Sequence, residues 1–279
     1  MYTIFKKLLV ILAVAIHSLA PIPTAPIRQT TTLVTVMYHS ILNGTTNKYT
    51  VSAKQLSSDL ELFKKHGFTP VSTAEVIDFV YNASTLPQKP ILVTFDDGCY
   101  NNLYYGVDIL KQNGFPATFN IVGEYTQTAT EDNQEPNANY SYLRWQDVTA
   151  LLNEGFEIGN HTFAMHKTYP RKGIAKLPNE LDSDYLKIIK GDIARLQFEI
   201  YNHCNYTPNV FAYPYGYTTK QSKKALKELG FKMLLTCNEG VTTLRQNDYT
   251  CLENVKRFNR SGYYDCQTFI QKILKHVKS

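Results

Sequence analysis

Short apolar segments alternate along the chain with segments whose apolar residues recur at helical spacing. Runs of apolar and β-branched residues predict buried strands, and apolar positions at i, i+3 and i+4 predict amphipathic helices. The predicted strands are residues 33–38, 91–95, 117–122, 156–159, 210–213 and 231–236. The predicted helices are residues 53–66, 73–80, 103–113, 145–153, 180–201 and 220–229.

This alternation is typical of a single α/β domain with a parallel sheet, either a barrel or an open sheet. Two polar stretches, residues 126–141 and 166–178, interrupt it and are predicted to be surface loops. In such folds the functional side chains collect where parallel strands end. The residues directly after each predicted strand are therefore the first candidates for a site.

Two adjacent carboxylates, Asp96 and Asp97, follow the predicted strand 91–95 and precede Gly98. Neighbouring carboxylates repel each other unless a cation or a shared proton lies between them. An Asp-Asp-Gly turn, in which the glycine supplies a positive φ, explains the same residues without any chemistry. These residues alone leave both interpretations open.

His161 and His166 follow the predicted strand 156–159 and are two of only seven histidines in the chain. A single histidine is usually a structural residue, but two beyond one strand favour metal binding. One carboxylate and two imidazoles form a mixed oxygen and nitrogen ligand set that suits zinc or another first-row divalent ion. An open position beside a second carboxylate is the arrangement that metal-assisted hydrolysis requires.

A third candidate segment, Tyr213-Pro214-Tyr215-Gly216, lies at the end of the predicted strand 210–213. A Pro-Gly turn with aromatic packing accounts for these residues on its own. This segment indicates a functional site only in combination with the other two segments.

Composition restricts the class of protein. Of the 279 residues, 43% are hydrophobic and 13% aromatic, so the chain can bury a full core and is not disordered. The net charge of +5 is too weak and too interspersed to favour binding to nucleic acid. The five cysteines form no CxxC pair, which argues against a structural zinc knuckle, while a bridge between Cys237 and Cys251 stays open.

The N-terminal segment predicts export. Lys6 and Lys7 precede an apolar stretch, residues 8–20, that matches the positive and hydrophobic regions of a secretory signal. A proline follows each plausible cleavage site, so residues 1–25 are either a cleaved signal peptide or an uncleaved membrane anchor. We expect a protein that is secreted or held on the extracellular face of the membrane, with residues 8–20 as the tether in the second case.

The three strand-end segments together carry a resemblance to a known family. TFDDG at 94–98, HTFAMH at 161–166 and PYG at 214–216, in this order, resemble the polysaccharide deacetylases of the NodB-homology type, carbohydrate esterase family four. GFPATFNIV at 114–122 and the run 145–162 extend the resemblance over most of residues 30–279. It implies one catalytic domain over residues 30–279, folded as a single distorted (β/α)7 barrel.

The resemblance also implies roles for individual residues. Asp96 resembles the general base, and Asp97 with His161 and His166 resembles the metal-binding triad. The backbone N–H of Tyr215 resembles a donor of the oxyanion hole. The implied cofactor is one divalent metal ion, zinc first, with cobalt, nickel or manganese as alternatives. The implied partner is a polysaccharide, bound by a monomer.

Several departures from the family pattern point to one of its branches. The metal histidines are five residues apart rather than four, an arginine is missing before Tyr213, and the late Leu-x-Leu-x-His is absent apart from His276 near the chain end. The poly-N-acetylglucosamine deacetylases of biofilm export share the five-residue spacing and take the late histidine from an early Tyr-His pair. Tyr38-His39 matches that pair. His39 is therefore the candidate general acid, with a structural role bonded to the backbone as the alternative.

The expected activity is metal-dependent hydrolysis of acetyl groups, N-acetyl or O-acetyl, on a cell-surface or extracellular polysaccharide. Asp96 would activate the water that attacks the acetyl carbonyl. Two other classes stay open: a carbohydrate-binding protein with a degenerate site, and a deaminase or amidase acting on another C–N bond. Arg257 and Arg260 either supply the charge of the missing arginine or form a solvated basic strand edge.

Overall fold

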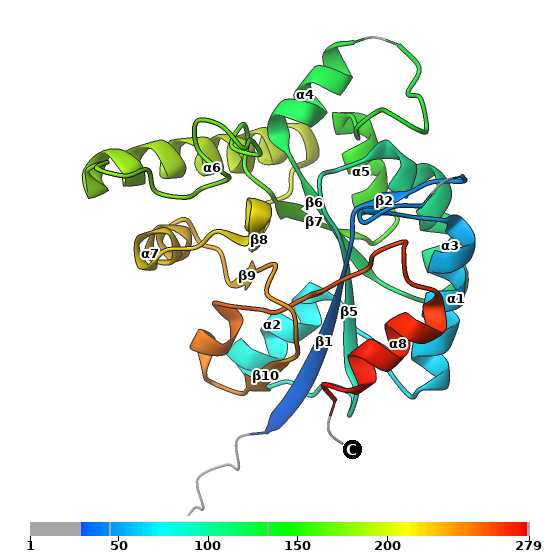
Figure 1. Ribbon diagram of the computed structural model, residues 1–279. Helices are drawn as coiled ribbons and strands as arrows, with labels where there is room; N and C mark the ends of the chain where they lie inside the picture. The colour runs from blue at the N-terminus through cyan, green and yellow to red at the C-terminus, as the bar shows by residue number, and fades with distance from the viewer. Residues whose placement is uncertain (1–28, 45, 133, 278–279) are drawn as a thin grey trace, which may run out of the picture.

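Apolar and β-branched segments form the strands of one large sheet in the computed structural model, which describes residues 29–44, 46–132 and 134–277 (Figure 1). The predicted signal peptide or anchor, residues 1–25, lies outside the described residues. Neighbouring strands pair in parallel in the order β1, β5, β6, β7, β8, β9. Their bounds are β1 Thr30–Tyr38, β5 Pro90–Phe95, β6 Ala117–Ile121, β7 Glu157–Asn160, β8 Val210–Ala212 and β9 Met233–Leu235.

A late segment closes this sheet into a distorted barrel. Val255 pairs with Leu235 of β9, and β11 (Phe258–Asn259) pairs in parallel with β1. The ring therefore has seven positions, β1, β5, β6, β7, β8, β9 and residues 255–259, which confirms the expected (β/α)7 barrel. Shorter strands complete the sheets: β10 Thr242–Arg245 against β1, β4 Thr69–Pro70 against β5, and the separate pair β2 Ser40–Ile41 and β3 Thr50–Val51.

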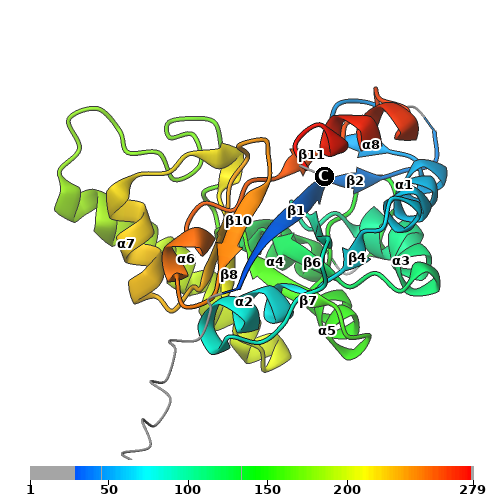
Figure 2. The ribbon, with the colours of Figure 1, turned by 90° about the horizontal axis from the view of Figure 1, so that it is seen from below.

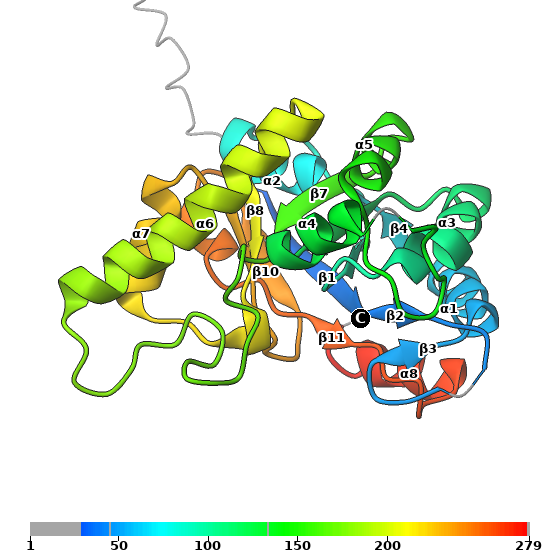
Figure 3. The same cartoon turned by 90° about the horizontal axis from the view of Figure 1, so that it is seen from above.

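Helices surround the barrel, as the views along its two ends show (Figure 2 and Figure 3). Capping boxes at Ser52 and Ser72 start the first two helices, because each serine accepts a hydrogen bond from the N–H three residues on. The helices are α1 Ala53–Lys65, α2 Thr73–Asn82, α3 Val107–Asn113, α4 Gly123–Glu131, α5 Trp145–Asn153, α6 Asp182–Cys204, α7 Lys220–Glu228 and α8 Cys266–Leu274, with the short η1 Asn102–Gly106, η2 Pro214–Gly216 and η3 Tyr249–Leu252. Within the described part of the chain, none of them is long and apolar enough to span a membrane.

The predicted loop over residues 126–141 is wrong at its start, because α4 continues through Glu131. The sequence of α4 is mostly polar and offers no apolar stripe that a pattern could detect. Tertiary contacts stabilise the helix instead. Gln127 Oε1 accepts a hydrogen bond from the Trp145 indole at 2.9 Å, and Thr130 Oγ1 accepts one from the Trp145 backbone N–H at 3.0 Å.

Stacked aromatic rings fix the ends of the central strands. Phe95 of β5 stacks on Tyr38 of β1 and on Phe119 of β6, with ring centroids 5.3 and 4.9 Å apart. These rings belong to the core between the sheet and the helices. Because side chains alternate along a strand, the next residue, Asp96, points to the opposite face, toward the barrel axis.

Candidate metal and catalytic site

All the site residues predicted from the sequence line one pocket of about 520 Å³ at the C-terminal ends of the barrel strands. They are His39, Asp96, Asp97, His161, His166 and Tyr215. Figure 3 looks onto this end of the barrel. The pocket is completed by Met37, Lys48, Tyr49, Lys172, Cys237 and Asn259. The fold therefore brings together residues that are up to 176 positions apart in the sequence, since 215 − 39 = 176.

Asp97, His161 and His166 form a cluster with the geometry of a metal site. One ligand atom from each residue can be chosen so that all three lie within 4.8 Å of one another. Asp97 Oδ1 lies 3.1 Å from His166 Nε2 and 3.5 Å from His161 Nε2. This oxygen is buried and accepts no hydrogen bond from any described residue. An orphaned buried carboxylate oxygen that faces two imidazole nitrogens fits a bound divalent cation.

The tautomer of His161 agrees with this fit. Its ring is buried, and Nδ1 lies 2.7 Å from the backbone oxygen of Ala212. A carbonyl oxygen only accepts, so Nδ1 carries the proton and donates it, which leaves the lone pair on Nε2 toward Asp97. A backbone carbonyl behind the ring is the usual way to orient a ligating histidine.

The electrostatics of the cluster favour positive charge. Burial alone would raise the pKa of the Asp97 carboxyl, but the neighbouring imidazoles of His161 and His166 outweigh burial and hold that pKa well below its ordinary value. Burial likewise disfavours a charged His161, yet Asp97 and Asp96 outweigh it and raise the pKa of that imidazole. Surroundings that stabilise an imidazolium also stabilise a metal cation.

Three non-glycine residues around the pocket have left-handed backbone conformations. They are Asp97 with φ 72°, Thr162 with φ 71° and Tyr215 with φ 59°. Each such residue costs about 1–3 kcal/mol, and strain of this kind concentrates at functional sites. All three lie two or three residues past the end of a barrel strand, and each belongs to one of the segments that the sequence singled out.

Asp96 is held by a buried arginine. Arg257 makes two hydrogen bonds to the carboxylate, at 2.8 Å to Oδ1 and 2.7 Å to Oδ2, and Asn120 Nδ2 adds a third at 2.7 Å. Burial would raise the pKa of Asp96, but the charges of Arg257 and then His161 lower it to about 2. Asp96 is therefore ionised throughout the neutral range.

The interpretation of Arg257 and Arg260 as a solvated strand edge is wrong, because both side chains are buried. Arg260 pairs with Asp59, with Nε 2.6 Å from Oδ2, and Asp59 also accepts a hydrogen bond from Tyr38 at 3.0 Å. Only Arg257 reaches the site. It places a positive charge directly against Asp96.

His39 lies beside the two carboxylates. Its Nδ1 is buried without a hydrogen-bond partner among the described residues, and its ring packs edge-on against Tyr49 with centroids 4.9 Å apart. Burial lowers the pKa of His39, although Asp97 and Asp96 act in the opposite direction. A lowered pKa makes the protonated ring a stronger acid.

Tyr215 completes the rim of the pocket through its position in η2. Its ring lies 4.8 Å from that of His166, and the Lys172 ammonium lies 5.5 Å from the centre of the Tyr215 ring. Gly216 has φ 75°, and a Cβ there would meet Cys237 Cβ at 2.8 Å, so the tight turn requires glycine.

The remaining described histidines lie away from the pocket. His276 packs against Phe258 with ring centroids 5.2 Å apart, and His203 stacks on Trp145 at 4.7 Å. His66 is the C-cap of α1. All five cysteines are free, so the bridge between Cys237 and Cys251 is not formed.

Several supporting residues were missed by the sequence analysis. Asn120 orients Asp96 from the middle of an apolar strand, and a buried asparagine in such a strand is a signal that could have been used. Gly159 leaves room for it, because a Cβ there would lie 1.9 Å from Asn120 Oδ1. Asp192 of α6 accepts hydrogen bonds from the backbone N–H groups of Phe163 and Ala164, both at 2.8 Å, and so shapes the loop between the two histidines.

Comparison with known proteins gives a consistent result. A family model described as polysaccharide deacetylase matches residues 83–234, which is more than half of the chain. The poly-beta-1,6-N-acetyl-D-glucosamine N-deacetylase of Escherichia coli K12 is 23% identical over 263 residues. That alignment covers 86% of this chain but only 38% of the relative, so the chain spans well under half the length of that protein.

Solved structures share the fold. IcaB from Ammonifex degensii aligns with a TM-score of 0.70 and 24% identity, covering 85% of this chain and 95% of that one. A de-N-acetylase from Aggregatibacter actinomycetemcomitans gives the same TM-score and identity, covering 85% of this chain and 99% of the other. Likeness at this level of identity establishes the barrel and its strand order.

Proposed function

Because the chain belongs to the polysaccharide deacetylase family, we propose that it is a metal-dependent hydrolase that removes N-acetyl groups from a polymer of N-acetylglucosamine. The observation that carries the proposal is the Asp97-His161-His166 cluster with a second, separately held carboxylate, Asp96, in the same pocket. The name of the Escherichia coli relative supports β-1,6-linked N-acetylglucosamine as the substrate.

Asp97, His161 and His166 would hold the metal ion through one carboxylate oxygen and two imidazole nitrogens, a donor set that fits zinc first and cobalt, nickel or manganese next. When bound, such an ion supplies Lewis acidity to the acetyl carbonyl and to the attacking water. The loop strain at Asp97 and Thr162 is consistent with ligands that are arranged before the ion arrives.

Asp96 would accept the proton of the attacking water. Arg257 and Asn120 fix the carboxylate in place, so its orientation costs nothing when the reaction starts. The pKa of about 2 keeps Asp96 ionised and ready to accept. Arg257 is a positioning residue in this scheme, since it acts through Asp96.

The backbone N–H of Tyr215 would donate to the oxyanion that forms as the new C–O bond appears. The C–N bond then breaks, and the amine leaves only if it takes up a proton. His39, next to both carboxylates, would give that proton from its ring. The products are acetate and a free amine on the sugar.

The proposal also covers the domain organisation and the location of the protein. Residues 30–279 would form the catalytic domain of a monomer, and residues 1–25 would export it as a signal peptide or hold it outside the membrane through residues 8–20. The substrate would then be a secreted or surface polysaccharide. Fractionation of the native host tests this, because a cytosolic full-length chain would contradict export.

The alternatives are weaker on specific grounds. A carbohydrate-binding protein with a degenerate site would be expected to lose ligands, whereas the complete Asp97-His161-His166 cluster and the base Asp96 are present. O-acetyl hydrolysis and cleavage of another C–N bond use the same groups, so only the substrate separates them from the proposed reaction.

A substrate panel tests the proposal directly. The purified protein, loaded with zinc or cobalt, is incubated with poly-β-1,6-N-acetylglucosamine, peptidoglycan, chitin oligomers and acetylated xylan, and released acetate and new amines are measured. We expect equal amounts of acetate and amine from the β-1,6-linked polymer. Acetate released from xylan alone would overturn the proposed substrate. No acetate from any polymer would overturn the proposed activity.

A further inference from the structure

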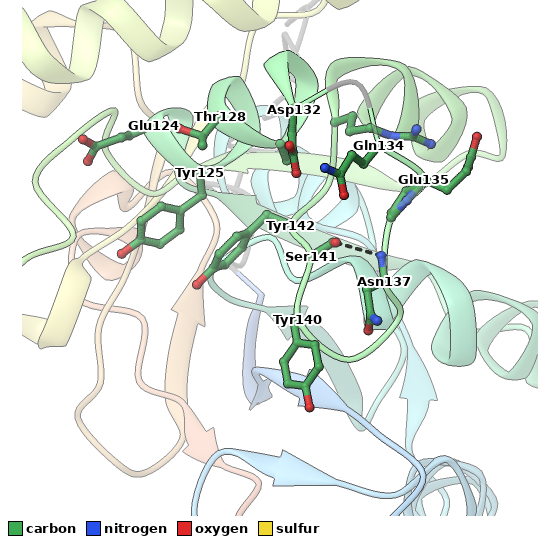
Figure 4. Close-up of a pocket in the computed structure, with 13 residues that line it drawn as sticks. Glu124, Tyr125, Thr128, Asp132, Gln134, Glu135, Asn137, Tyr140, Ser141 and Tyr142 are labelled. Carbon is green, nitrogen blue, oxygen red and sulfur yellow. Dashed lines mark hydrogen bonds between the residues drawn. The ribbon is translucent and has the colours of Figure 1, made fainter.

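Figure 4 shows a second pocket, of about 630 Å³. It adjoins the catalytic pocket, since its residue Tyr125 contacts His166. One wall is α4, which contributes Tyr125 and Thr128, and the other is the loop over residues 134–142. Its volume is in the range of pockets that take small organic ligands. None of the roles assigned above uses it.

This second pocket is built onto the catalytic segment. Tyr142 pairs with Cys99, Leu143 N–H donates to Gly98 O at 2.8 Å, and Tyr100 N–H donates to Ser141 O at 2.9 Å. The end of the loop is therefore hydrogen-bonded to residues 98–100, which directly follow Asp96 and Asp97. From the other wall, the Tyr125 hydroxyl donates to the backbone oxygen of His166 at 3.2 Å. Tyr125 of the second pocket is thus in direct contact with His166 of the catalytic pocket.

Three tyrosines are among the residues that line the second pocket. Tyr125 and Tyr142 lie side by side with ring centroids 4.4 Å apart, and Figure 4 shows their hydroxyls on the same side. Tyr140, farther along the loop, is 82% exposed. A large aromatic side chain that is this exposed adds little to folding stability, but it offers an apolar face with a polar tip to a ligand.

The charges and polar groups around these rings suit a sugar. Glu124 pairs with Lys167 at 3.0 Å, and Arg144 pairs with Asp147 at 2.9 Å. Asp132 is one of the carboxylates in the lining that add a modest negative charge, which disfavours polyanions. The C–H face of a pyranose ring can stack on tyrosine, its hydroxyls can bond to the polar loop, and the amine of a unit already deacetylated suits the acidic rim.

We propose that this second pocket is a subsite for the sugar units that neighbour the reacting unit of the polymer, with Tyr140 and the Tyr125–Tyr142 pair as stacking platforms. The inference rests on the proposed deacetylase function and adds to it. The enzyme then prefers longer oligomers, because each additional unit that reaches the tyrosines contributes binding that the reacting unit alone cannot supply.

The first arm of the test compares the dimer and the pentamer of β-1,6-linked N-acetylglucosamine by kcat/KM for acetate release. Tyr140→Ala should lower the pentamer-to-dimer ratio about tenfold, because one ring loses its contact with a sugar face. Thr128→Trp, which fills the pocket from the α4 side, should lower the same ratio. Tyr201→Ala is the matched control, since Tyr201 is 55% exposed on α6 and lines neither pocket.

The second arm measures binding without turnover. In the Asp96→Asn background, the Kd of the pentamer measured by calorimetry should rise about tenfold on adding Tyr140→Ala and stay unchanged on adding Tyr201→Ala. An unchanged Kd and an unchanged ratio in both pocket variants would overturn the subsite while leaving the deacetylase intact. If the wild type releases no acetate from either oligomer, the proposed function fails, and the Kd comparison still decides whether the second pocket binds the sugar.

Discussion

Removing the charge of Arg257 tests whether its buried ion pair with Asp96 serves the reaction. Arg257→Met keeps an unbranched apolar side chain but deletes the hydrogen bonds to Asp96 at 2.8 and 2.7 Å. The side chains of Arg257 and Asp96 are only 0% and 3% exposed. Breaking one partner of such a pair costs about 3–5 kcal/mol, because the remaining charge is buried without compensation. We expect the free energy of unfolding to fall by an amount of that order.

The carboxylate left behind can reduce this cost by taking up a proton. In the wild type, the depressed pKa of about 2 contributes stability above the ordinary value of 3.8, and this contribution is lost as the pH falls toward 2. Without the guanidinium, burial dominates and the pKa of Asp96 rises. A protonated Asp96 accepts no proton from water, so turnover should fall by ~10²-fold or more.

Arg260→Met is the matched control. Arg260 is equally buried and pairs with Asp59, but it does not line the catalytic pocket. We expect a similar loss of stability in urea denaturation, with turnover per folded molecule nearly unchanged. Arg257→Lys provides a second test if the methionine variant does not fold. Lysine keeps the charge but cannot make the bidentate hydrogen bonds to Asp96. Full turnover in folded Arg257→Met, or equal losses of turnover in both methionine variants, would refute the reasoning.

Two further substitutions separate chemistry from metal binding. Asp96→Asn should retain the metal and the fold but lose ~10²–10⁴-fold in rate, as metal analysis beside the acetate assay would show; loss of the metal instead would exchange the roles of Asp96 and Asp97. His39→Ala should lower turnover ~10²-fold at unchanged metal content, whereas His276→Ala should be nearly silent. A fully active His39→Ala enzyme would remove the acid role.

The sequence predicted the residues of the catalytic pocket because they lie a few positions past the ends of strands. Asp97 and His161 each stand just past a strand, and parallel strands end at the same rim of a barrel. The strand order alone is therefore enough to predict that these side chains lie close together. The resemblance to the family added the predicted role of each residue. The order of elements along the chain was predictable for the same reason, since apolar periodicity is a local property of the sequence.

The supporting residues could not be assigned in the same way. Arg257 is 161 positions from Asp96, and only the closure of the barrel by residues 255–259 brings them together. The residues next to Arg257 in the sequence do not include the carboxylate that it pairs with. The sequence therefore could not decide whether Arg257 is buried in the site or exposed on a strand edge. α4 was missed because its stability comes from hydrogen bonds to Trp145 rather than from an apolar face. One wall of the second pocket was therefore also missed, because α4 forms it.

Metal content measured together with deacetylation tests the central claim most directly. Protein purified without chelator should contain about one divalent ion per chain, bound by Asp97, His161 and His166. Chelation should abolish acetate release from poly-β-1,6-N-acetylglucosamine, and readdition of zinc or cobalt should restore it. His161→Ala should lose metal and activity together. Full acetate release by a thoroughly chelated, metal-free sample would contradict the account.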